Sequence, residues 1–366
     1  MLLGCKSERN KVMQFGLQKK SLIAIRMVKF GGGAESSVNN LVKFLKSNGI
    51  NVRDLCFSEF KKNVNFMHKY CDLIRYIYQI RVESKNADYL LACVEGAPFL
   101  MAAIATIGMS KRPVLWLHCE PTEYLKFVSF KQRLLIWLSI LIANNIICAS
   151  PWYANYISNI SKKRIRFLPN FVGSEPALTG AQDKYDIKRS NYIYVGSLSK
   201  LKNISACFSF LALLGAQKHT CFDIYGDGSE RGNLIKESII LQNTCFVSFK
   251  GHVPVDWQSH SAKSILLVPS FTEALPMVIV EALSHGIPVI TNKYKGYEYF
   301  SMHDGLVESV EFNCPSAVKG ASEILGNLSS SEYNRRFTNT KLFLSKNFDN
   351  TKNFLGLMEF FSTMHH

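Results

Sequence analysis

Short apolar runs recur along this chain, and each is followed by a longer stretch whose apolar residues are three and four positions apart. The short runs end in glycine, proline or polar turn residues, which is typical of buried β-strands. The longer stretches have the spacing of helices that pack one face on a core. Runs of the first kind lie at 21–28, 51–57, 113–121, 145–150, 191–196, 264–268 and 288–291. This alternation predicts the α/β class, with two parallel sheets.

Polar stretches divide this pattern into parts. Residues 1–20 are mostly polar and basic, and we interpret them as an N-terminal extension before the first strand. Residues 176–190 are polar and mixed, as expected of a linker between domains. The expected domains are therefore 21–175 and 191–349, followed by an apolar and aromatic helix at 350–366.

The pattern is sharpest around the strand at 264–268. This strand runs into a polar loop that carries Glu273, and Pro276 then opens a helix that contains Glu281. Proline suits the first helical position, because its missing N–H would have no partner there. The free amides and the dipole of such a helix start favour an anion such as a phosphate. The two glutamates are then placed to bind hydroxyls of the same ligand. The alternative is an ordinary surface loop and helix with two solvated glutamates.

Composition and charge narrow the class of protein. With 366 residues, of which 47% are apolar and 19% charged, the chain can fold into two or three packed domains. Ten cysteines occur without C-x-x-C or Cys/His ligand spacing, which predicts mostly buried thiols in a reducing cytosol. Residues 1–150 hold 21 Lys/Arg and 10 Asp/Glu, so they carry +11 of the net +15. This excess predicts an anionic partner, and without a nucleic-acid motif we expect no nucleic acid.

The segment 126–143 fits two interpretations. It combines Lys126, Lys131 and Arg133 with a broad apolar face. A packed helix that leads into the next strand would have this pattern, and so would a patch that lies in a membrane interface. Its apolar run is about half the length of a transmembrane helix. Residues 1–19 lack the apolar core of a signal peptide, so we expect a cytoplasmic protein without a spanning segment.

The sequence around the two glutamates resembles a known family. E-A-L-P-M-V-I-V-E, preceded by P-S-F-T, is similar to the E-x7-E signature of glycosyltransferase family 4. Members of that family are retaining enzymes that use nucleotide sugars and have the GT-B fold. The resemblance therefore implies two Rossmann-like domains with parallel sheets that face across a cleft.

The start of the second domain resembles the diphosphate-binding loop of the family. G-S-L-S-K-L-K-N, which begins at Gly196, is similar to G-R-L-x-x-x-K-N and places Lys202 at the position of the diphosphate-binding lysine. The family arginine is Ser197 here. A serine is only a neutral donor, whereas a guanidinium binds a diphosphate through charge-assisted hydrogen bonds. Lys202 must therefore carry more of the charge, or share it with Lys200.

Two further segments of the second domain match family motifs. The strand and turn at 222–234 contain G-D-G, which corresponds to the family's G-x-G and includes Gly226. The strand at 247–253 matches F-x-G-x-V, whose backbone lies beside the nucleotide base, and it includes Gly251 and Val253.

The first domain resembles the family more sparsely. Its first strand leads into Gly31, Gly32 and Gly33, which correspond to a loop where the backbone approaches the donor phosphates and the acceptor. A plain tight strand–helix turn is the alternative. His118 ends the strand at 113–121, at a position where the family often has a histidine near the donor sugar. A structural histidine is the alternative there.

The segment at 164–173 and the tail fit the same family. RIRFLPNFVG resembles the V-P-N-G-V segment that closes the first domain, with Phe171 in place of the family glycine. Chains of this fold commonly return their last helix to the first domain, which implies that 350–366 packs there.

The resemblance implies a reaction and a set of residues for it. The reaction is retaining transfer of a sugar from a nucleotide-diphosphate sugar to a saccharide acceptor, with no cofactor and no metal. The expected catalytic residues are Glu273, Lys202 and His118. Glu281 is the expected ligand of the ribose. The full set of expected donor-binding residues is Glu281, Ser197, Gly196, Ala274, Leu275, Pro276, Met277, Val278, Gly226, Gly251 and Val253.

The acceptor is implied by analogy and by charge. Cytosolic, basic enzymes of this type extend saccharides linked to polyprenyl pyrophosphate at the anionic inner leaflet of a bacterial membrane. This implies a peripheral hexosyltransferase of lipopolysaccharide O-antigen or capsule and exopolysaccharide biosynthesis. Two alternatives stay open: a nucleotide-sugar epimerase of the same fold, and a nucleotide-sugar-binding subunit without activity, which Ser197 suggests.

Overall fold

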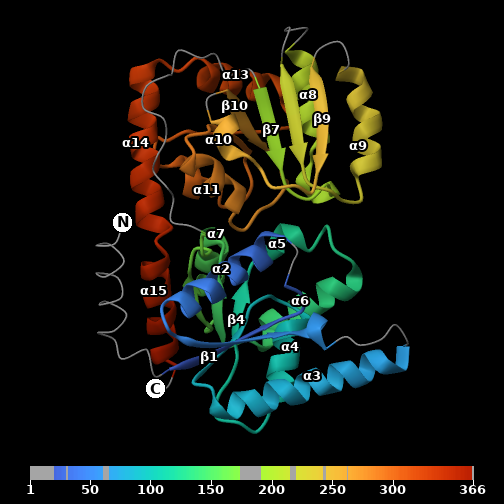
Figure 1. The fold of residues 1–366 in the computed structure, drawn as a ribbon, viewed down its shortest axis with the longest axis vertical. Coiled ribbons are helices and arrows are strands. Elements are labelled where there is room, and N and C mark those ends of the chain that lie inside the picture. The colour runs from blue at the N-terminus through green and yellow to red at the C-terminus, as the bar shows by residue number, and fades with distance from the viewer. Residues whose placement is uncertain are drawn as a thin grey trace. The chain divides into compact units, whose positions relative to one another are not determined.

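Two six-stranded parallel sheets form the framework of the protein (Figure 1). The computed structural model describes residues 20–29, 32–60, 66–173, 191–214, 220–241, 245–261 and 263–364. The chain divides into two compact units. Unit 1 comprises 1–120, 128–173 and 348–366, and unit 2 comprises 121–127 and 174–347. The predicted α/β class with two parallel sheets is confirmed.

The sheet of unit 1 has the strand order β2-β1-β3-β4-β5-β6. Its strands are β1 (Ser21–Arg26), β2 (Asn51–Cys56), β3 (Tyr89–Ala92), β4 (Val114–Leu117), β5 (Asn145–Cys148) and β6 (Arg164–Phe167). The main helices of the unit are α2 (Gly33–Ser47), α3 (Phe66–Asn86), α4 (Ala97–Ala105), α6 (Phe130–Ile142), α7 (Pro151–Ile160) and α15 (Asn350–Ser362). The strands alternate with the helices along the chain, so all neighbouring strands are parallel.

The last helix packs into the core of unit 1. Phe354, Leu357 and Phe361 of α15 are buried in one cluster with the inward side of α2 and with Trp116 of β4. The Asn350 side chain accepts a hydrogen bond from the Val172 amide at 3.0 Å and donates one to the Val172 carbonyl at 2.9 Å. The apolar and aromatic tail therefore forms part of the hydrophobic core of unit 1.

The sheet of unit 2 has the order β12-β11-β10-β7-β8-β9. Its strands are β7 (Asn191–Val195), β8 (Cys221–Tyr225), β9 (Phe246–Gly251), β10 (Ser264–Val268), β11 (Val289–Asn292) and β12 (Val307–Val310). Its helices include α8 (Ser205–Leu213), α9 (Arg231–Ser238), α10 (Trp257–His260), α11 (Met277–Ser284), α12 (Glu298–Ser301), α13 (Pro315–Gly326) and α14 (Ser330–Asn347). The strand order reverses direction beside β7 and β10, which is where ligands bind in open α/β sheets.

One strand differs from the sequence-based expectation. Neither the short apolar runs nor the family motifs found in the sequence cover β12, which pairs in parallel with β11 at the edge of the sheet. Its four residues, Val-Glu-Ser-Val, are too few for a clear alternation, and only Val307 is fully buried. These residues form a strand because they pair with β11, and the local sequence pattern does not predict the strand.

Residues 121–127 belong to unit 2, although the chain on both sides of them belongs to unit 1. They begin with the short helix α5 (Pro121–Tyr124). The Lys295 ammonium lies 3.1 Å from a Glu123 carboxylate oxygen. The Phe127 ring stacks on Phe271, with 5.6 Å between the ring centroids. These side-chain contacts, far apart in sequence, place a segment of the predicted first domain in unit 2.

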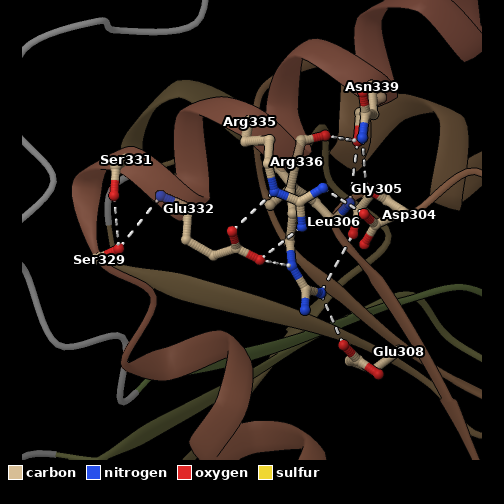
Figure 2. A network of polar contacts seen from close by, with 11 residues as sticks. Asp304, Gly305, Leu306, Glu308, Ser329, Ser331, Glu332, Arg335, Arg336 and Asn339 are labelled. Atoms are coloured by element: carbon tan, nitrogen blue, oxygen red, sulfur yellow. Dashed lines mark hydrogen bonds and ion pairs between the residues drawn. The ribbon is translucent and has the colours of Figure 1, made fainter.

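Charged side chains fix α14 against the edge of the second sheet (Figure 2). Arg336 binds Glu308 of β12 at 2.8 Å and Glu332 at 3.0 Å. Arg335 makes two further bonds to Glu332 and an ion pair with Asp304. The hydrogen bonds from these guanidinium groups hold the Glu332 carboxylate in its charged form and lower its pKa to about 2. The chain leaves this anchored helix directly for α15.

Candidate donor-binding site

Backbone hydrogen bonds shape the loop that follows β7. The Gly196 amide donates to the Tyr225 carbonyl at 3.0 Å, and the Leu198 amide donates to Asp227 at 3.0 Å. Gly226 lies so close that a Cβ atom on it would be 1.9 Å from the Gly196 carbonyl oxygen. Gly226 also has a φ of 129°, which side chains rarely allow. A glycine is therefore required at this position of the G-D-G segment.

The same loop is joined to the loop that follows β10. The Phe271 amide donates to the Leu201 carbonyl at 3.0 Å. The Asn203 side chain donates to the Pro269 carbonyl at 3.3 Å. The Tyr194 hydroxyl donates to the Ser197 carbonyl at 2.9 Å. The loops after three neighbouring strands thus form one hydrogen-bonded unit at the carboxyl edge of the sheet.

These loops bring two of the predicted catalytic residues into contact. The Lys202 ammonium and a Glu273 carboxylate oxygen are 2.5 Å apart, and the side chains are 22% and 14% exposed. Lys202 lies on a short 3-10 turn, Lys200–Lys202, and Glu273 lies in the loop before α11. A lysine has three N–H donors, so this pair leaves two donors of Lys202 for a ligand such as a phosphate.

The helix α11 follows this ion pair in the chain. Pro276 is the residue before its first turn, with φ −71° and ψ 105°, and Met277 is the first helical residue. The expectation that Pro276 itself opens the helix is therefore wrong by one position, because its ψ is extended. Helical geometry leaves the amides of the first turn, such as those of Met277 and Val278, without partners inside the helix.

Glu281 lies in the second turn of α11. Part of its side chain is open to solvent, yet the packing of protein atoms around the carboxyl group raises its pKa. Burial raises the pKa of a carboxyl group because it disfavours the charged form.

The other predicted donor-binding residues gather at the same edge. The Gly226 amide donates to the Gly251 carbonyl at 2.7 Å, and Val253 follows Gly251 in a tight turn. Gly251 has a φ of 74° and Val253 is half exposed. Ser197 and Lys200 are exposed, whereas Leu275 and Pro276 are buried and Ala274 is partly buried. The structure thus places the predicted set of unit 2 on adjacent loops, and their role stays a prediction.

His118 follows β4 in unit 1. Both of its ring nitrogens are buried, and neither has a hydrogen-bond partner among the described residues. Burial lowers the pKa of His118 to about 4. The Cys93 backbone and the Asn170 side chain lie near the ring and oppose this shift, but by distance and angle neither is a hydrogen-bond partner. His118 is therefore neutral near pH 7 and acts there as a neutral donor or acceptor.

Sequence analysis missed the polar groups around His118. Glu95, which follows β3, accepts a hydrogen bond from the His118 backbone amide at 3.0 Å. Burial raises the pKa of Glu95. The side-chain oxygen of Asn170 and the indole nitrogen of Trp116 are buried and, like the imidazole, have no hydrogen-bond partner in the part of the chain that the structure describes. Glu95 and Asn170 each follow a strand of the same sheet closely, a position that would have marked them as candidates.

The glycine loop of unit 1 is described only in part. Gly31 lies outside the described residues. Gly32 has an ordinary φ of −89°, and its amide donates to the Glu35 carboxylate at 2.9 Å. Gly33 is the first residue of α2, and a Cβ atom on it would meet nothing within 4 Å. A carboxylate therefore already lies at the start of α2, which disfavours a phosphate at that position.

Comparison with known proteins identifies the domain that carries this site. Residues 182–341 match the family model described as "Glycosyl transferases group 1". This match covers a little less than half of the chain. A curated relative is the lipopolysaccharide core biosynthesis glycosyltransferase LpsE of Rhizobium meliloti (strain 1021), 27% identical over 166 residues. That alignment covers 44% of this chain and 47% of the relative, so the chain matches about half of its length.

Solved structures resemble the fold over nearly the whole chain. Anabaena Alr3699/HepE in complex with UDP and glucose has a TM-score of 0.71 at 16% identity, over 94% of this chain and all of that chain. The lipopolysaccharide outer core galactosyltransferase WaaB has a TM-score of 0.65 at 20% identity, over 93% and 99%. A sucrose-phosphate synthase from Thermosynechococcus elongatus has a TM-score of 0.70 at 15% identity, over 95% of this chain and 99% of that chain. The region that matches the glycosyltransferase group 1 model thus lies in a chain with the GT-B fold, and these findings support the predicted enzyme class, glycosyltransferase.

Two searches of the described residues concern metals and membranes. No group of three or more His, Cys, Asp and Glu side chains in the described part of the chain could hold a metal ion. Among the helices that the structure describes, none has the length and apolar character needed to cross a bilayer.

Proposed function

We propose that the protein transfers a sugar, with retention, from a nucleotide-diphosphate sugar to a saccharide acceptor. The observation that carries this proposal is the Lys202–Glu273 ion pair at 2.5 Å, between the Gly196 loop and the start of α11. A cation and a carboxylate meet there on loops held by backbone hydrogen bonds, and α11 begins four residues after Glu273. Such a preorganised set suits a leaving diphosphate, whose charge develops during the reaction.

In this proposal each group has one task. Lys202 and the first amides of α11 bind the diphosphate, and Glu273 stabilises positive charge near the anomeric carbon. The bond from that carbon to the phosphate oxygen breaks, and a bond to the acceptor oxygen forms on the same face. The acceptor proton passes to the leaving phosphate oxygen. Glu281 binds the ribose hydroxyls, and the backbone near Gly251 and Val253 lies beside the base.

Ser197 and Lys200 set the charge of the proposed site. Ser197 is exposed, and its backbone carbonyl accepts hydrogen bonds from the Tyr194 hydroxyl and the Ser199 amide. No guanidinium therefore stands at this position to share the diphosphate with Lys202. Lys200 lies on the same short turn but is exposed, whereas Lys202 faces Glu273. We assign the main cationic contact to Lys202.

The proposed acceptor is a saccharide carried on a polyprenyl pyrophosphate, in the assembly of lipopolysaccharide O-antigen, capsule or exopolysaccharide. The curated relative, whose name places it in lipopolysaccharide core biosynthesis, supports a surface polysaccharide. The net charge of +11 in residues 1–150 supports work at an anionic inner leaflet. We assign the family, glycosyltransferase family 4, from the E-x7-E segment.

A turnover assay with UDP-sugars tests the proposal, because two similar structures contain UDP. We expect release of UDP that depends on an added lipid-linked saccharide, together with a longer saccharide product. An inverted sugar centre with no transfer would indicate an epimerase. Binding of UDP without any turnover would indicate a binding subunit. Product anomers read by NMR separate retention from inversion.

A further inference from the structure

One layer of helices in unit 1 exposes an unusual number of apolar side chains. The layer consists of α3, α4 and α6, which pack side by side in that order. Most helices at the surface of a protein turn their apolar stripe toward the core and their polar side toward water. In this layer the outward side of α6 and part of the outward side of α3 are apolar as well.

The outward stripe of α6 has helical spacing. Phe130, Leu134, Trp137 and Leu141 recur every three or four residues, and all are exposed. Phe130 is 78% and Trp137 52% exposed, whereas only Ile136 and Ser139 of this helix are buried. The segment 130–142 contains Lys131 and Arg133 and no acidic residue. This is the composition of a helix that lies in a membrane interface.

The same character continues on α3 and α4. Tyr70, Ile74 and Tyr78 of α3 are four residues apart, and Ile74 and Tyr78 are 66% and 67% exposed. Ile104 of α4 and Ile107 just after it are also exposed. The described basic side chains of α3, Arg75, Arg81 and Lys85, are exposed beside this stripe. Apolar and aromatic side chains are thus interleaved with cations.

Polar contacts hold the three helices in one layer. Arg81 of α3 donates to the carbonyls of Ala105 and Ile107 at 2.8 and 3.0 Å. The amide of Gly96, which precedes α4, donates to the Ser139 hydroxyl of α6 at 3.1 Å. Lys163 binds three carbonyls at the end of α6, at 2.6 to 2.8 Å. The exposed stripes are therefore displayed on a fixed support.

We infer that the outward face of α3, α4 and α6 binds the surface of an anionic lipid bilayer. This inference rests on the proposed function, which requires access to a lipid-linked acceptor. Tyrosine and tryptophan favour the interface between lipid and water, and Lys and Arg bind anionic headgroups. A second copy of the chain fits less well, because a symmetric contact would bring Lys131 and Arg133 of both copies together. Exposed apolar patches of this kind mark interaction surfaces.

Vesicle binding by variants that replace exposed apolar residues with glutamate tests the surface. We expect Phe130→Glu/Trp137→Glu, and separately Ile74→Glu, to lower binding to vesicles with anionic lipid by about tenfold or more, because each change places a charge in the interface. Leu342→Glu, an exposed apolar position of α14 in unit 2, is the matched control and should bind like the unchanged protein. No binding of the unchanged protein to anionic vesicles, or equal binding by all variants, would overturn the inference.

Two natural cysteines give a second readout on the unchanged protein. Cys71 lies on α3 next to Tyr70, and Cys314 lies in unit 2, and both are exposed. Anionic vesicles should slow alkylation of Cys71 several-fold and leave Cys314 unchanged, as measured by mass spectrometry of the two peptides. Protection of Cys71 without vesicles, in a concentration-dependent dimer, would instead assign the face to a second copy and overturn the inference.

The test of the membrane-binding surface and the test of the proposed function can give different outcomes. The melting temperature with and without UDP reports the donor site of each variant independently of lipid. A variant that keeps its UDP shift and loses vesicle binding supports the surface. Vesicle binding by a protein that neither binds UDP nor transfers sugar would reject the proposed function but would still support the membrane-binding surface.

Discussion

The carboxyl edges of the two sheets are built in different ways. In unit 2, backbone hydrogen bonds join the loops after β7, β8 and β10, and the Gly226 backbone contacts that of Gly196. In unit 1, the groups near the end of β4 are side chains, and the imidazole of His118 and the oxygen of Asn170 are buried with no hydrogen-bond partner among the residues that the structure describes. A shape made by the backbone suits a ligand that is common to many enzymes. A region lined by side chains can change more readily from one protein to another.

This difference explains what the sequence could reveal. Backbone-built loops need glycines and prolines at fixed spacing, so Gly226 and Pro276 stand out in the sequence, as do Lys202 and Glu273 beside them. The contact of Lys202 with Glu273 joins residues 71 positions apart, and only the motif resemblance placed both at one ligand. Glu95 belongs to no motif, and Asn170 lies in the segment that resembles V-P-N-G-V, to which the sequence assigned no role beside His118. Their proximity to His118 arises from strand order, which a single sequence does not contain.

The fold shows the same limit. The predicted α/β alternation needed only the local periodicity of apolar residues, which each segment carries by itself. The edge strand β12 and the position of residues 121–127 in unit 2 depend on distant partners, β11 and Lys295. Elements that are decided by such partners escape a local reading.

The largest expected effect comes from removing the cation of the donor site. Lys202→Ala should lower kcat/KM by roughly 100-fold or more, the scale of losing one preorganised donor at a developing charge. Ser197→Arg should be tolerated, because Ser197 is exposed and takes part in the loop through its backbone carbonyl, and it should partly restore Lys202→Ala. Steady-state kinetics of the double-mutant cycle measure this coupling.

Lys200→Ala is the matched control for this cycle, since it removes an exposed lysine of the same turn. Near-normal activity of Lys202→Ala would show that the loop does not bind the diphosphate. An inactive Ser197→Arg enzyme would show that another group already fills the space beside it.

A single methyl group should disturb the backbone-built loops. In Gly226→Ala the new Cβ would lie 1.9 Å from the Gly196 carbonyl oxygen, so one of the two loops must move. We expect UDP affinity to fall by about tenfold or more, since such strain costs more than 1 kcal/mol. Gly232→Ala is the control, because a Cβ atom there meets nothing within 4 Å. Equal affinities of the two variants, measured by calorimetry, would contradict this description of the loops.

Glu281→Ala should weaken donor binding more than it slows the reaction. Its proposed partners are ribose hydroxyls, which are bound equally in the ground and transition states. Loss of such uniform binding appears in KM. We expect KM for the donor to rise by about tenfold with kcat nearly unchanged. A large fall in kcat at constant KM would remove the ribose assignment.

The smallest expected effect is a proton-binding change at His118. Its pKa lies near 4 in the folded protein against 6.5 for a free histidine, so the folded state binds fewer protons between these values. Stability should therefore fall as the pH drops from about 6.5 toward about 4, and His118→Gln should reduce that slope. Imidazole NMR signals of the folded protein, compared with those of the variant, measure the pKa directly. Titration of His118 near pH 6.5 would contradict the burial of its ring.

Calorimetric titration with UDP tests the central claim, that the Lys202–Glu273 loops form a nucleotide-diphosphate site. The unchanged protein should bind one UDP per chain, with micromolar affinity on the order of −8 kcal/mol. Lys202→Ala should lose most of this affinity, and Lys200→Ala should keep it. Absence of UDP, GDP and ADP binding by the unchanged protein, or equal binding by Lys202→Ala, would contradict the account.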